Sequence, residues 1–272
     1  MHPVENELEH ALRLAMDDPA ARPDFYAALL EASVLAIGAV ARSEDGRSPG
    51  GKARLQGWRA DDGSGILPFF TSSLALERAL VAFEASARMP EAAWRGAGHV
   101  QLPMRTFLGL IKGAAIILNP GSENAKRFGP EEVAMLASTG LGAAASQRSI
   151  AYDATTVLRQ PRPYPAALVE VVSRFLFRRP AVQAAYIAQL VGPDRTERPH
   201  LLIGLELDGA SERIFEELAV VMEDGLGANG PIDVIPMSPR DIGISASLRA
   251  AGGPFYKRRG SGWAALFRGG GR

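Results

Sequence analysis

Two apolar segments of the chain each end in a short polar turn, and these turns restrict the fold more than any other feature of the sequence. Residues 67–72 read LPFFTS, and residues 118–122 read LNPGS. Short apolar runs that end in turn-forming residues are typical of buried strands. Residues 128–132 (FGPEE) then place a proline and two glutamates where a helix can begin, since proline fits the first helical position and acids favour the first turn. The pattern predicts strands that alternate with helices.

Hydrophobic spacing predicts an α+β domain in the first half of the chain. Residues 6–15 carry apolar side chains on one helical face, and residues 34–40 form a short apolar run that is typical of a buried strand. Residues 55–59 and 66–71 flank the turn sequence DDGSG, which predicts a hairpin. We place this domain at residues 1–138.

The composition of the chain changes after residue 138. Gly, Ala, Ser, Gln and Arg are frequent until the proline-rich segment QPRPYP at 160–165, and we interpret residues 139–165 as a linker. A second α+β domain is predicted at residues 166–258, and residues 259–272 form an extra basic and aromatic tail. We therefore expect two consecutive α+β domains, each with a small mixed sheet packed with helices.

Helix and strand patterns also alternate in the second domain. Residues 166–177 predict a helix, and its apolar side consists of Leu168, Val171, Val172, Phe175 and Leu176. The other predicted elements are strands at 182–191, 200–207 and 232–237 and a helix at 212–222. Ser238 is followed by a proline and, three positions on, by Asp241, which predicts that a last helix starts at Ser238.

The charge balance and the absence of cysteine exclude several classes of function. Lys plus Arg and Asp plus Glu number 30 each, so the chain lacks the basic excess that nucleic-acid binding needs. Without cysteine, the chain cannot form disulfides, thiol nucleophiles, thiolate zinc sites or iron–sulfur clusters. The acidic N-terminus is unlike a signal peptide, and no apolar run has the roughly 20 residues of a membrane span. We expect a cytoplasmic protein with no membrane span.

No segment carries a catalytic or metal-binding motif that we can identify. The pattern G-x-G-x-x-A at residues 140–145 follows a helix instead of a strand, so we interpret it as a flexible helix end and not as a dinucleotide site. The four histidines are scattered, and local sequence ties none of them to a serine. We interpret Ser72 and Ser122 as a helix cap and a turn residue. The sequence predicts no catalytic residue, no metal site and no cofactor.

Five residues are candidates for binding. Asn119 ends a predicted strand, where its side chain can bond the local backbone or face a ligand, and turn chemistry favours the structural role. Phe255, Tyr256, Lys257 and Arg258 combine aromatic and cationic side chains, which suit an acidic partner. The same four residues can also form a last strand whose charged ends reach into solvent. Both interpretations of this segment stay open.

The ordered set of segments resembles the bacterial SseB (enhanced serine sensitivity) family across residues 5–258. Segments that resemble its N-terminal domain are NELE at 6–9, FY at 25–26, LPFFTS at 67–72 and LNPGS at 118–122. Segments that resemble its C-terminal domain are YP at 164–165, VQAAY at 182–186, LIGL at 202–205 and PFYKR at 254–258. The resemblance implies a link to serine sensitivity when the protein is overproduced, and it brings no catalytic residue.

Two complete domains without a catalytic motif favour binding over catalysis. Our hypothesis is a cytoplasmic interaction or regulatory protein with an unidentified protein partner, whose excess disturbs amino-acid metabolism. One alternative is a binder of a small metabolite, such as an amino acid, in a cleft between the domains that polar turns would line. An unrecognised hydrolase at the same place and a structural subunit of a larger assembly are further alternatives.

Overall fold

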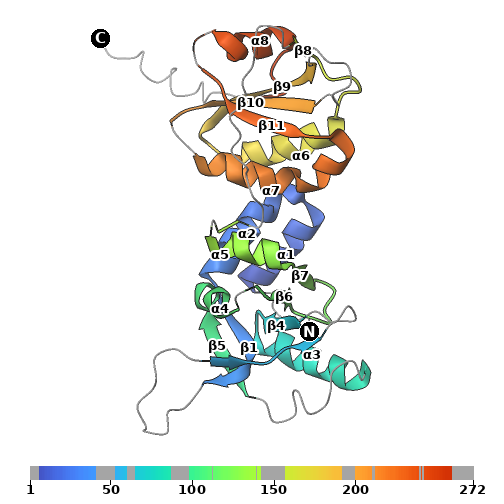
Figure 1. Cartoon of the computed structure of the whole chain (residues 1–272), viewed down its shortest axis with the longest axis vertical. Helices are drawn as coiled ribbons and strands as arrows, with labels where there is room; N and C mark the ends of the chain where they lie inside the picture. The colour runs from blue at the N-terminus through green and yellow to red at the C-terminus, as the bar shows by residue number, and fades with distance from the viewer. Residues whose placement is uncertain are drawn as a thin grey trace, which may run out of the picture. The chain divides into compact units, whose positions relative to one another are not determined.

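The structure, a computed structural model, describes residues 6–40, 53–59, 65–86, 98–111, 113–138, 140–141, 157–191, 200–209, 212–238, 240 and 242–258. The chain divides into two compact units, Met1–Ala144 and Ala145–Arg272. Each unit packs helices against one mixed sheet, and Figure 1 labels these elements in chain order. The predicted fold class, two consecutive α+β domains, is confirmed.

The described part of the N-terminal unit contains a mixed sheet with the strand order β2-β1-β4-β6-β7. Its helices are α1 (Glu7–Asp17), α2 (Arg22–Glu31), α3 (Ser73–Ser86), α4 (Met104–Leu110) and α5 (Pro130–Ser138). Its strands are β1 (Ser33–Val40), β2 (Ala53–Leu55), β3 (Trp58–Arg59), β4 (Gly65–Phe70), β5 (His99–Pro103), β6 (Ala115–Leu118) and β7 (Lys126–Phe128). Strands β3 and β4 form the predicted hairpin, and β4 runs parallel to β6. The carboxyl ends of β4 and β6 therefore meet at one edge of the sheet.

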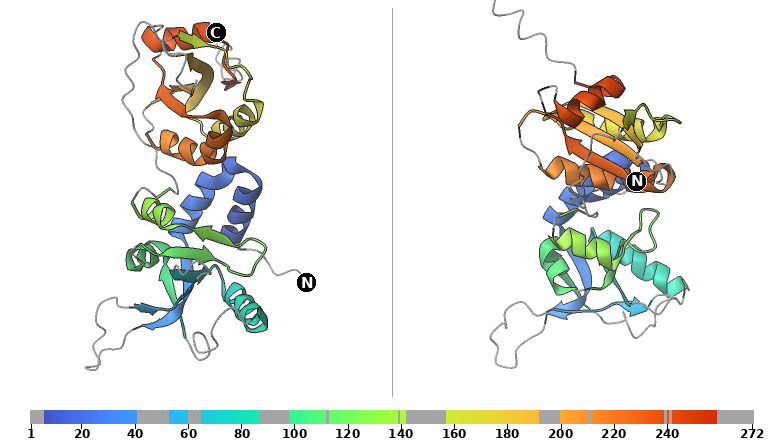
Figure 2. Two further views of the ribbon diagram at one scale, coloured as in Figure 1. Left: turned by 45° about the vertical axis from the view of Figure 1, so that its right-hand side comes forward. Right: turned by 45° about the horizontal axis from the view of Figure 1, so that its top comes forward.

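Alternation along β4 sends two neighbouring phenylalanines to opposite faces of the sheet. Phe69 packs against the rings of Phe107 in α4 and Phe128 in β7, with centroids 5.4 and 6.0 Å away. Phe70 instead packs in a cluster with Leu76 of α3, and Figure 2 shows α3 and α4 on opposite sides of the strands. Burial of one such ring stabilises the fold by about 2 kcal/mol. The sheet thus has a core on both faces.

The described part of the C-terminal unit contains a second mixed sheet, with the order β11-β10-β9-β12 and with β8 beside β9. Its strands are β8 (Val157–Arg159), β9 (Val182–Val191), β10 (His200–Leu207), β11 (Ile232–Pro236) and β12 (Tyr256–Lys257). Its helices are α6 (Ala166–Phe177), α7 (Glu212–Asn229) and α8 (Gly243–Ala251). Only β10 and β11 are parallel among these pairs of described strands. Helix α7 connects them.

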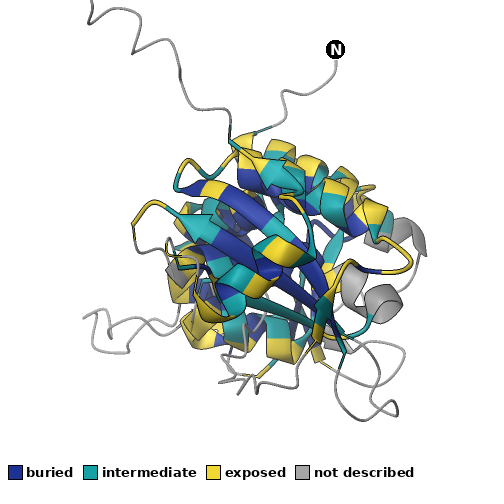
Figure 3. Ribbon diagram, turned by 90° about the horizontal axis from the view of Figure 1, so that it is seen from above, coloured by how far each residue is buried: buried dark blue, intermediate teal, exposed yellow. Residues whose placement is uncertain are grey.

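Helix α8 packs on the opposite face of this sheet from α6 and α7 (Figure 1). Leu248 of α8 and Met237 lie in one buried cluster with Leu202 of β10. Gly204 allows this close approach, since a Cβ atom there would lie 2.6 Å from the Met237 sulfur and 2.8 Å from Leu248 Cδ1. Figure 3 shows the buried residues concentrated in the strands and the exposed residues on the outer sides of the helices. Because α8 packs directly on the backbone of β10, the positions of its polar side chains relative to this strand are fixed.

Most predicted elements of the second domain are confirmed. Helix α6 and strands β9 and β10 have the predicted bounds, while α7 continues past residue 222 to Asn229. Strand β8 lies inside the predicted linker 139–165 and pairs with the end of β9. Within the parts of the chain described above, no helix has the length and apolar character that crossing a membrane requires.

The prediction that the last helix starts at Ser238 is wrong. The Ser238 hydroxyl accepts a hydrogen bond from the Arg240 amide at 3.1 Å, and the Ser238 amide donates to the Ser245 hydroxyl at 2.9 Å. Ser238 therefore closes a turn ahead of the helix. Helix α8 begins at Gly243, after Ile242 in an extended conformation. The local cap pattern could not show that Ser245, in the first turn of α8, binds the Ser238 amide.

Candidate functional site

The polar turns that follow β4 and β6 lie side by side and are joined through the Asn119 side chain. The Asn119 amide continues the strand pairing by donating to the Phe69 carbonyl at 2.9 Å. Asn119 Oδ1 accepts from the Thr71 amide at 3.0 Å, and Asn119 Nδ2 donates to the Thr71 hydroxyl at 2.9 Å. Both ends of the Asn119 amide group are therefore occupied by Thr71.

The backbone of Asn119 adopts a left-handed conformation. Its φ is 45°, and among the described residues it is the only residue other than glycine with a positive φ. Asn119 is 4% exposed. Asparagine tolerates this region better than most residues. The Ser122 hydroxyl donates to the Asn119 carbonyl at 2.8 Å and closes the turn. The structure places Asn119, a predicted binding candidate, in a turn where its polar atoms hold other parts of the chain.

The N-terminus of α1 completes this group. The Glu9 carboxylate accepts hydrogen bonds from the hydroxyl groups of Thr71 and Ser72, the latter at 3.3 Å, although Thr71 is 62 residues away in the sequence. Asn6 caps α1 and forms a capping box with Glu9, and its side chain donates to the Thr71 carbonyl at 3.3 Å. We call Asn6, Glu9, Thr71, Ser72 and Asn119 the motif cluster.

The motif cluster uses its side chains to connect secondary structure. The Ser72 hydroxyl accepts from the Ala75 amide at 3.1 Å and so caps α3, as predicted. Glu9 is both an α1 cap residue and the acceptor for the turn after β4. The hydroxyl of Thr71 donates to Glu9 and accepts from Asn119. In the described residues, no three His, Asp or Glu side chains are placed to hold a metal ion. The geometry of the cluster ties α1, β4, β6 and α3 together.

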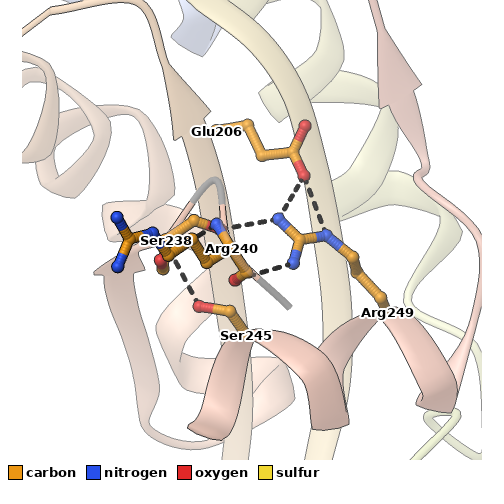
Figure 4. Close-up of polar contacts among 5 residues, drawn as sticks. All are labelled: Glu206, Ser238, Arg240, Ser245 and Arg249. Atoms are coloured by element: carbon orange, nitrogen blue, oxygen red, sulfur yellow. Dashed lines mark hydrogen bonds and ion pairs between the residues drawn. The ribbon is translucent and has the colours of Figure 1, made fainter. Parts of the chain in front are cut away.

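A second polar group lies where the parallel strands β10 and β11 end (Figure 4). Arg249 of α8 donates to one oxygen of Glu206 through Nε at 3.1 Å and through Nη2 at 2.8 Å. Arg249 Nη2 also donates to the Ser238 carbonyl at 2.7 Å. We call Glu206, Ser238, Arg240, Ser245 and Arg249 the C-terminal clamp. It fastens α8 and the preceding turn to β10.

Tyr186 of β9 lies next to the C-terminal clamp. Partial burial raises the pKa of its hydroxyl above the usual value of 10.0, and the negative charge of Glu206 acts in the same direction. A hydrogen bond with Arg249 opposes both effects. Tyr186 thus lies beside a half-buried ion pair in which the Arg249 and Glu206 side chains are 23% and 29% exposed.

The predicted binding segment at the C-terminus is divided between the two faces of the sheet. The Tyr256 hydroxyl donates to the Leu176 carbonyl at 3.2 Å, on the α6 face. Lys257 pairs with Ala184, so its exposed side chain belongs to the opposite face. Phe255 is half-buried, and its amide donates to the Ala185 carbonyl at 2.9 Å. Tyr256 and Lys257 form the short strand β12, the element that one of the two interpretations predicts, while Phe255 and Arg258 lie just outside it.

Arg258 caps the end of α6. Its guanidinium donates to the carbonyls of Val182, Leu176, Phe177 and Arg179, at distances of 2.9, 3.1, 3.3 and 2.6 Å. Unpaired carbonyls at a helix end are the usual acceptors for such a cation. The structure thus brings Tyr256 and Arg258 together at α6, while Asn119 belongs to the other unit.

The outer face of α6 carries the most exposed large apolar side chain of the described residues. Phe177 is 74% exposed. Arg174 and Arg178, three positions before it and one after it, are also exposed. Arg174 forms an ion pair with Glu170 at 2.7 Å. We call Glu170, Arg174, Phe177 and Arg178 the α6 outer face. Phe177 lies outside the apolar side that the sequence predicts for this helix. This position was the sequence signal for an exposed aromatic side chain.

Comparison with known families identifies both domains. The model of the SseB protein N-terminal domain matches residues 8–135, and the model of the SseB protein C-terminal domain matches residues 150–258. The chain belongs to the SseB family. Protein SseB of Escherichia coli (strain K12) is 30% identical over 268 residues, or 98% of each chain, and Protein SseB of Shigella flexneri matches to the same extent. No solved structure matches the chain.

The motif cluster gathers the segments that carry the SseB resemblance in the first domain. Asn6 and Glu9 come from NELE, Thr71 and Ser72 from LPFFTS, and Asn119 from LNPGS. Each segment is recognisable by itself in the sequence, whereas the structure shows that the segments form hydrogen bonds with one another. The resemblance to the SseB family is confirmed. Residues from three of the segments that carry this resemblance form one hydrogen-bonded group.

Proposed function

We propose that this SseB family member acts in the cytoplasm by binding a protein partner and not by catalysing a reaction. The observation that supports this proposal is the α6 outer face, where Phe177 is 74% exposed beside two exposed arginines. Aromatic residues and arginine are enriched at protein interfaces relative to the rest of the protein surface. The family resemblance implies a link to serine sensitivity when the protein is overproduced, so we expect a partner in amino-acid metabolism.

The polar groups at the strand ends support the same proposal. A nucleophilic serine needs a positioned base, and the Ser72 hydroxyl already accepts from the Ala75 amide and donates to Glu9. Asn119 is occupied by Thr71, and Arg249 by Glu206 and Ser238. These side chains hold the chain together, which favours a binding role for surfaces elsewhere over a reaction at the strand ends.

Binding of a small metabolite is the second candidate function. One observation favours it: the motif cluster lies beyond the carboxyl ends of the parallel strands β4 and β6, and open sheets commonly bind ligands there. The carboxylate of Glu9 and the amide of Asn119 are groups that recognise an amino acid. Such a ligand would have to displace hydrogen bonds within the cluster.

The two functions are separated by one preparation of the full-length tagged chain. We expect a native lysate to yield a protein partner in near-stoichiometric amount with the wild-type chain. Absence of such a partner under all growth conditions tested would contradict the proposal. The same preparation is heated with each amino acid at saturating concentration. A ligand at about 100 times its dissociation constant adds roughly 2.7 kcal/mol to the free energy of unfolding, so a raised melting temperature would favour the metabolite instead.

A further inference from the structure

Two arginines at the end of β8 are gathered around one buried side-chain amide. Arg159 lies directly opposite Gln189 in the pairing of β8 with β9, so the two side chains share one face of the sheet. Arg159 Nε donates to Gln189 Oε1 at 3.3 Å, and the Arg162 backbone amide donates to the same oxygen at 3.5 Å. Gln189 is 8% exposed. We call Arg159, Arg162 and Gln189 the β8 arginine group.

No acid of the described chain neutralises these two arginines. Arg159 and Arg162 are both exposed. Within the described segments, the bond from Arg159 to Gln189 is the only hydrogen bond or ion pair that either guanidinium forms. In contrast, the exposed side chains of Arg105 and Arg174 each pair with a glutamate at 2.7 Å. The β8 arginine group therefore has a positive charge that the fold leaves unbalanced.

Gln189 offers a further donor to this group. Its Oε1 atom accepts from Arg159 and Arg162, while its Nε2 atom has no hydrogen-bond partner among the described residues. Charged side chains on a border strand discourage pairing with other chains, which explains the presence of charge on β8. That role does not require a buried amide that holds two arginines together. An unpaired amide donor beside two unpaired cations indicates a place for an acceptor from outside the chain.

The beginning of α6 has the same electrostatic sign. Ala166, the first residue of α6, follows Arg162 by four positions. Pro165 provides no side-chain cap, and the first turn of the helix contains no acid. The amide of Ala167, an exposed residue, has no backbone partner in the described part of the chain. Free amides at a helix N-terminus favour an anion. This helix end makes no site by itself, but it adds to the charge of the arginines.

The number of donors favours a phosphate group over a carboxylate. A single guanidinium satisfies both oxygens of a carboxylate through paired hydrogen bonds. A phosphate monoester carries a charge of about −1.5 to −2 at neutral pH and has three acceptor oxygens, which matches two arginines and the Nε2 donor of Gln189. Binding to a nucleic acid needs several cations along an extended face, whereas this group offers two, in a chain whose basic and acidic residues balance at 30 each.

We infer that the β8 arginine group binds the phosphate group of a small molecule, with Arg159 and Arg162 as the charged contacts and Gln189 Nε2 as a neutral donor. This site lies outside the motif cluster, the C-terminal clamp and the α6 outer face, and it does not depend on the protein contact proposed above.

Titration with inorganic phosphate tests the inference in the full-length chain. Two-dimensional NMR spectra of the isotope-labelled protein are recorded while phosphate replaces chloride at constant ionic strength. We expect saturable shifts of the backbone amide signals of Arg162 and Ala167 and of the side-chain amide signals of Gln189. Acetate, which carries a single carboxylate, should bind at least about tenfold more weakly. Shifts at these signals that do not saturate, or equal affinity for acetate, would overturn the inference.

Removal of charge supplies the matched comparison. The double variant Arg159→Gln and Arg162→Gln should weaken phosphate binding at least about tenfold. The control variant Arg105→Gln and Arg174→Gln removes the same charge from exposed arginines that already pair with glutamates, so it should bind phosphate like the wild-type chain. Circular dichroism checks that both variants fold. Unchanged affinity in the folded β8 variant, or equal weakening in both variants, would overturn the inference.

A charge-preserving variant keeps the test decisive if the glutamine variant does not fold. Arg159→Lys with Arg162→Lys retains both charges but loses the paired donors of guanidinium, so phosphate affinity should fall several-fold, and unchanged affinity would overturn the inference. A final titration compares glycerol 3-phosphate with a single-stranded oligonucleotide. We expect the small monoester to bind at least as tightly as inorganic phosphate. Tighter binding of the oligonucleotide than of the monoester would overturn the assignment to a small molecule.

Discussion

The motif cluster and the C-terminal clamp occupy equivalent places in their two sheets but use different chemistry. Each lies where a pair of parallel strands ends, and each fastens a helix to that edge. The motif cluster joins α1 through hydroxyls, amides and one carboxylate. The clamp joins α8 through a guanidinium and a carboxylate. Open sheets usually bind ligands at this edge, but in both units the chain's own side chains occupy it. Mostly neutral groups do so in the motif cluster, and an ion pair does so in the clamp.

The largest effect is expected for Asn119→Ala. Alanine is unfavourable at a φ of 45°, and the Thr71 amide loses its acceptor. Together these changes should lower the free energy of unfolding by about 3 kcal/mol. Asn119→Gly keeps the backbone freedom but not the hydrogen bonds, so it should lose less. Urea denaturation of the three proteins measures the difference, and equal losses for alanine and glycine would show that backbone conformation contributes nothing at this turn.

The next effect is expected for Arg249→Met in the C-terminal clamp. Methionine preserves much of the side-chain length but leaves Glu206 and the Ser238 carbonyl without their donor. Because the pair is partly exposed, we expect a loss of about 2 kcal/mol, less than for a fully buried pair. Repeating the urea titration in about 0.5 M salt should shrink this loss, since salt screens the pair in the wild-type chain. The loss for Asn119→Ala should not shrink, and a similar salt response at both sites would remove the proposed contrast.

A smaller loss is expected for Thr71→Val. Valine has nearly the same shape, but it cannot donate to Glu9 or accept from Asn119. Loss of these bonds should lower the free energy of unfolding by about 1.5 kcal/mol. Hydrogen exchange should become faster at the start of α1 and of α3, and it should stay unchanged in α8. Faster exchange in α8 alone would contradict the assignment of Thr71 to the motif cluster.

The smallest effect concerns the pH dependence of stability at Tyr186, beside the C-terminal clamp. The pKa of Tyr186 is raised, first by burial and then by Glu206, so the folded state holds this proton more tightly than the unfolded state. The associated stability is fully present below the unfolded-state pKa and is lost as the pH rises through the folded-state pKa. Between about pH 9 and about pH 11, Tyr186→Phe should therefore lose less stability than the wild-type chain. Parallel curves for the two proteins would contradict a raised pKa.

The elements of the fold were more predictable from sequence than the contacts between them. Apolar spacing and turn residues locate α6, β9 and β10, because these signals lie within each segment. The bond between Glu9 and Thr71 joins residues 62 positions apart, and it follows from the pairing of β4 with β6 and the position of α1. Local pattern cannot supply that information.

Two residues show how tertiary contacts change a local interpretation. Ser238 has the sequence pattern of a helix cap, yet Ser245 and Arg249 hold its amide and carbonyl in a turn before α8. Arg258 carries a charge that suits an acidic partner, yet its guanidinium donates to backbone carbonyls at the end of α6. In contrast, the position of Phe177 outside the apolar side of α6 was visible in the sequence. Its degree of exposure depends on which neighbours cover the helix.

The most direct test compares partner recovery by Thr71→Val and Phe177→Ala at a temperature where both variants are folded. Thr71 contributes to the stability of the fold, and we propose that Phe177 contacts the partner. We expect Thr71→Val to have a lower melting temperature but to recover the wild-type amount of partner, whereas Phe177→Ala keeps the wild-type melting temperature and loses the partner. The reverse result, with the partner lost by Thr71→Val and kept by Phe177→Ala, would contradict both assignments.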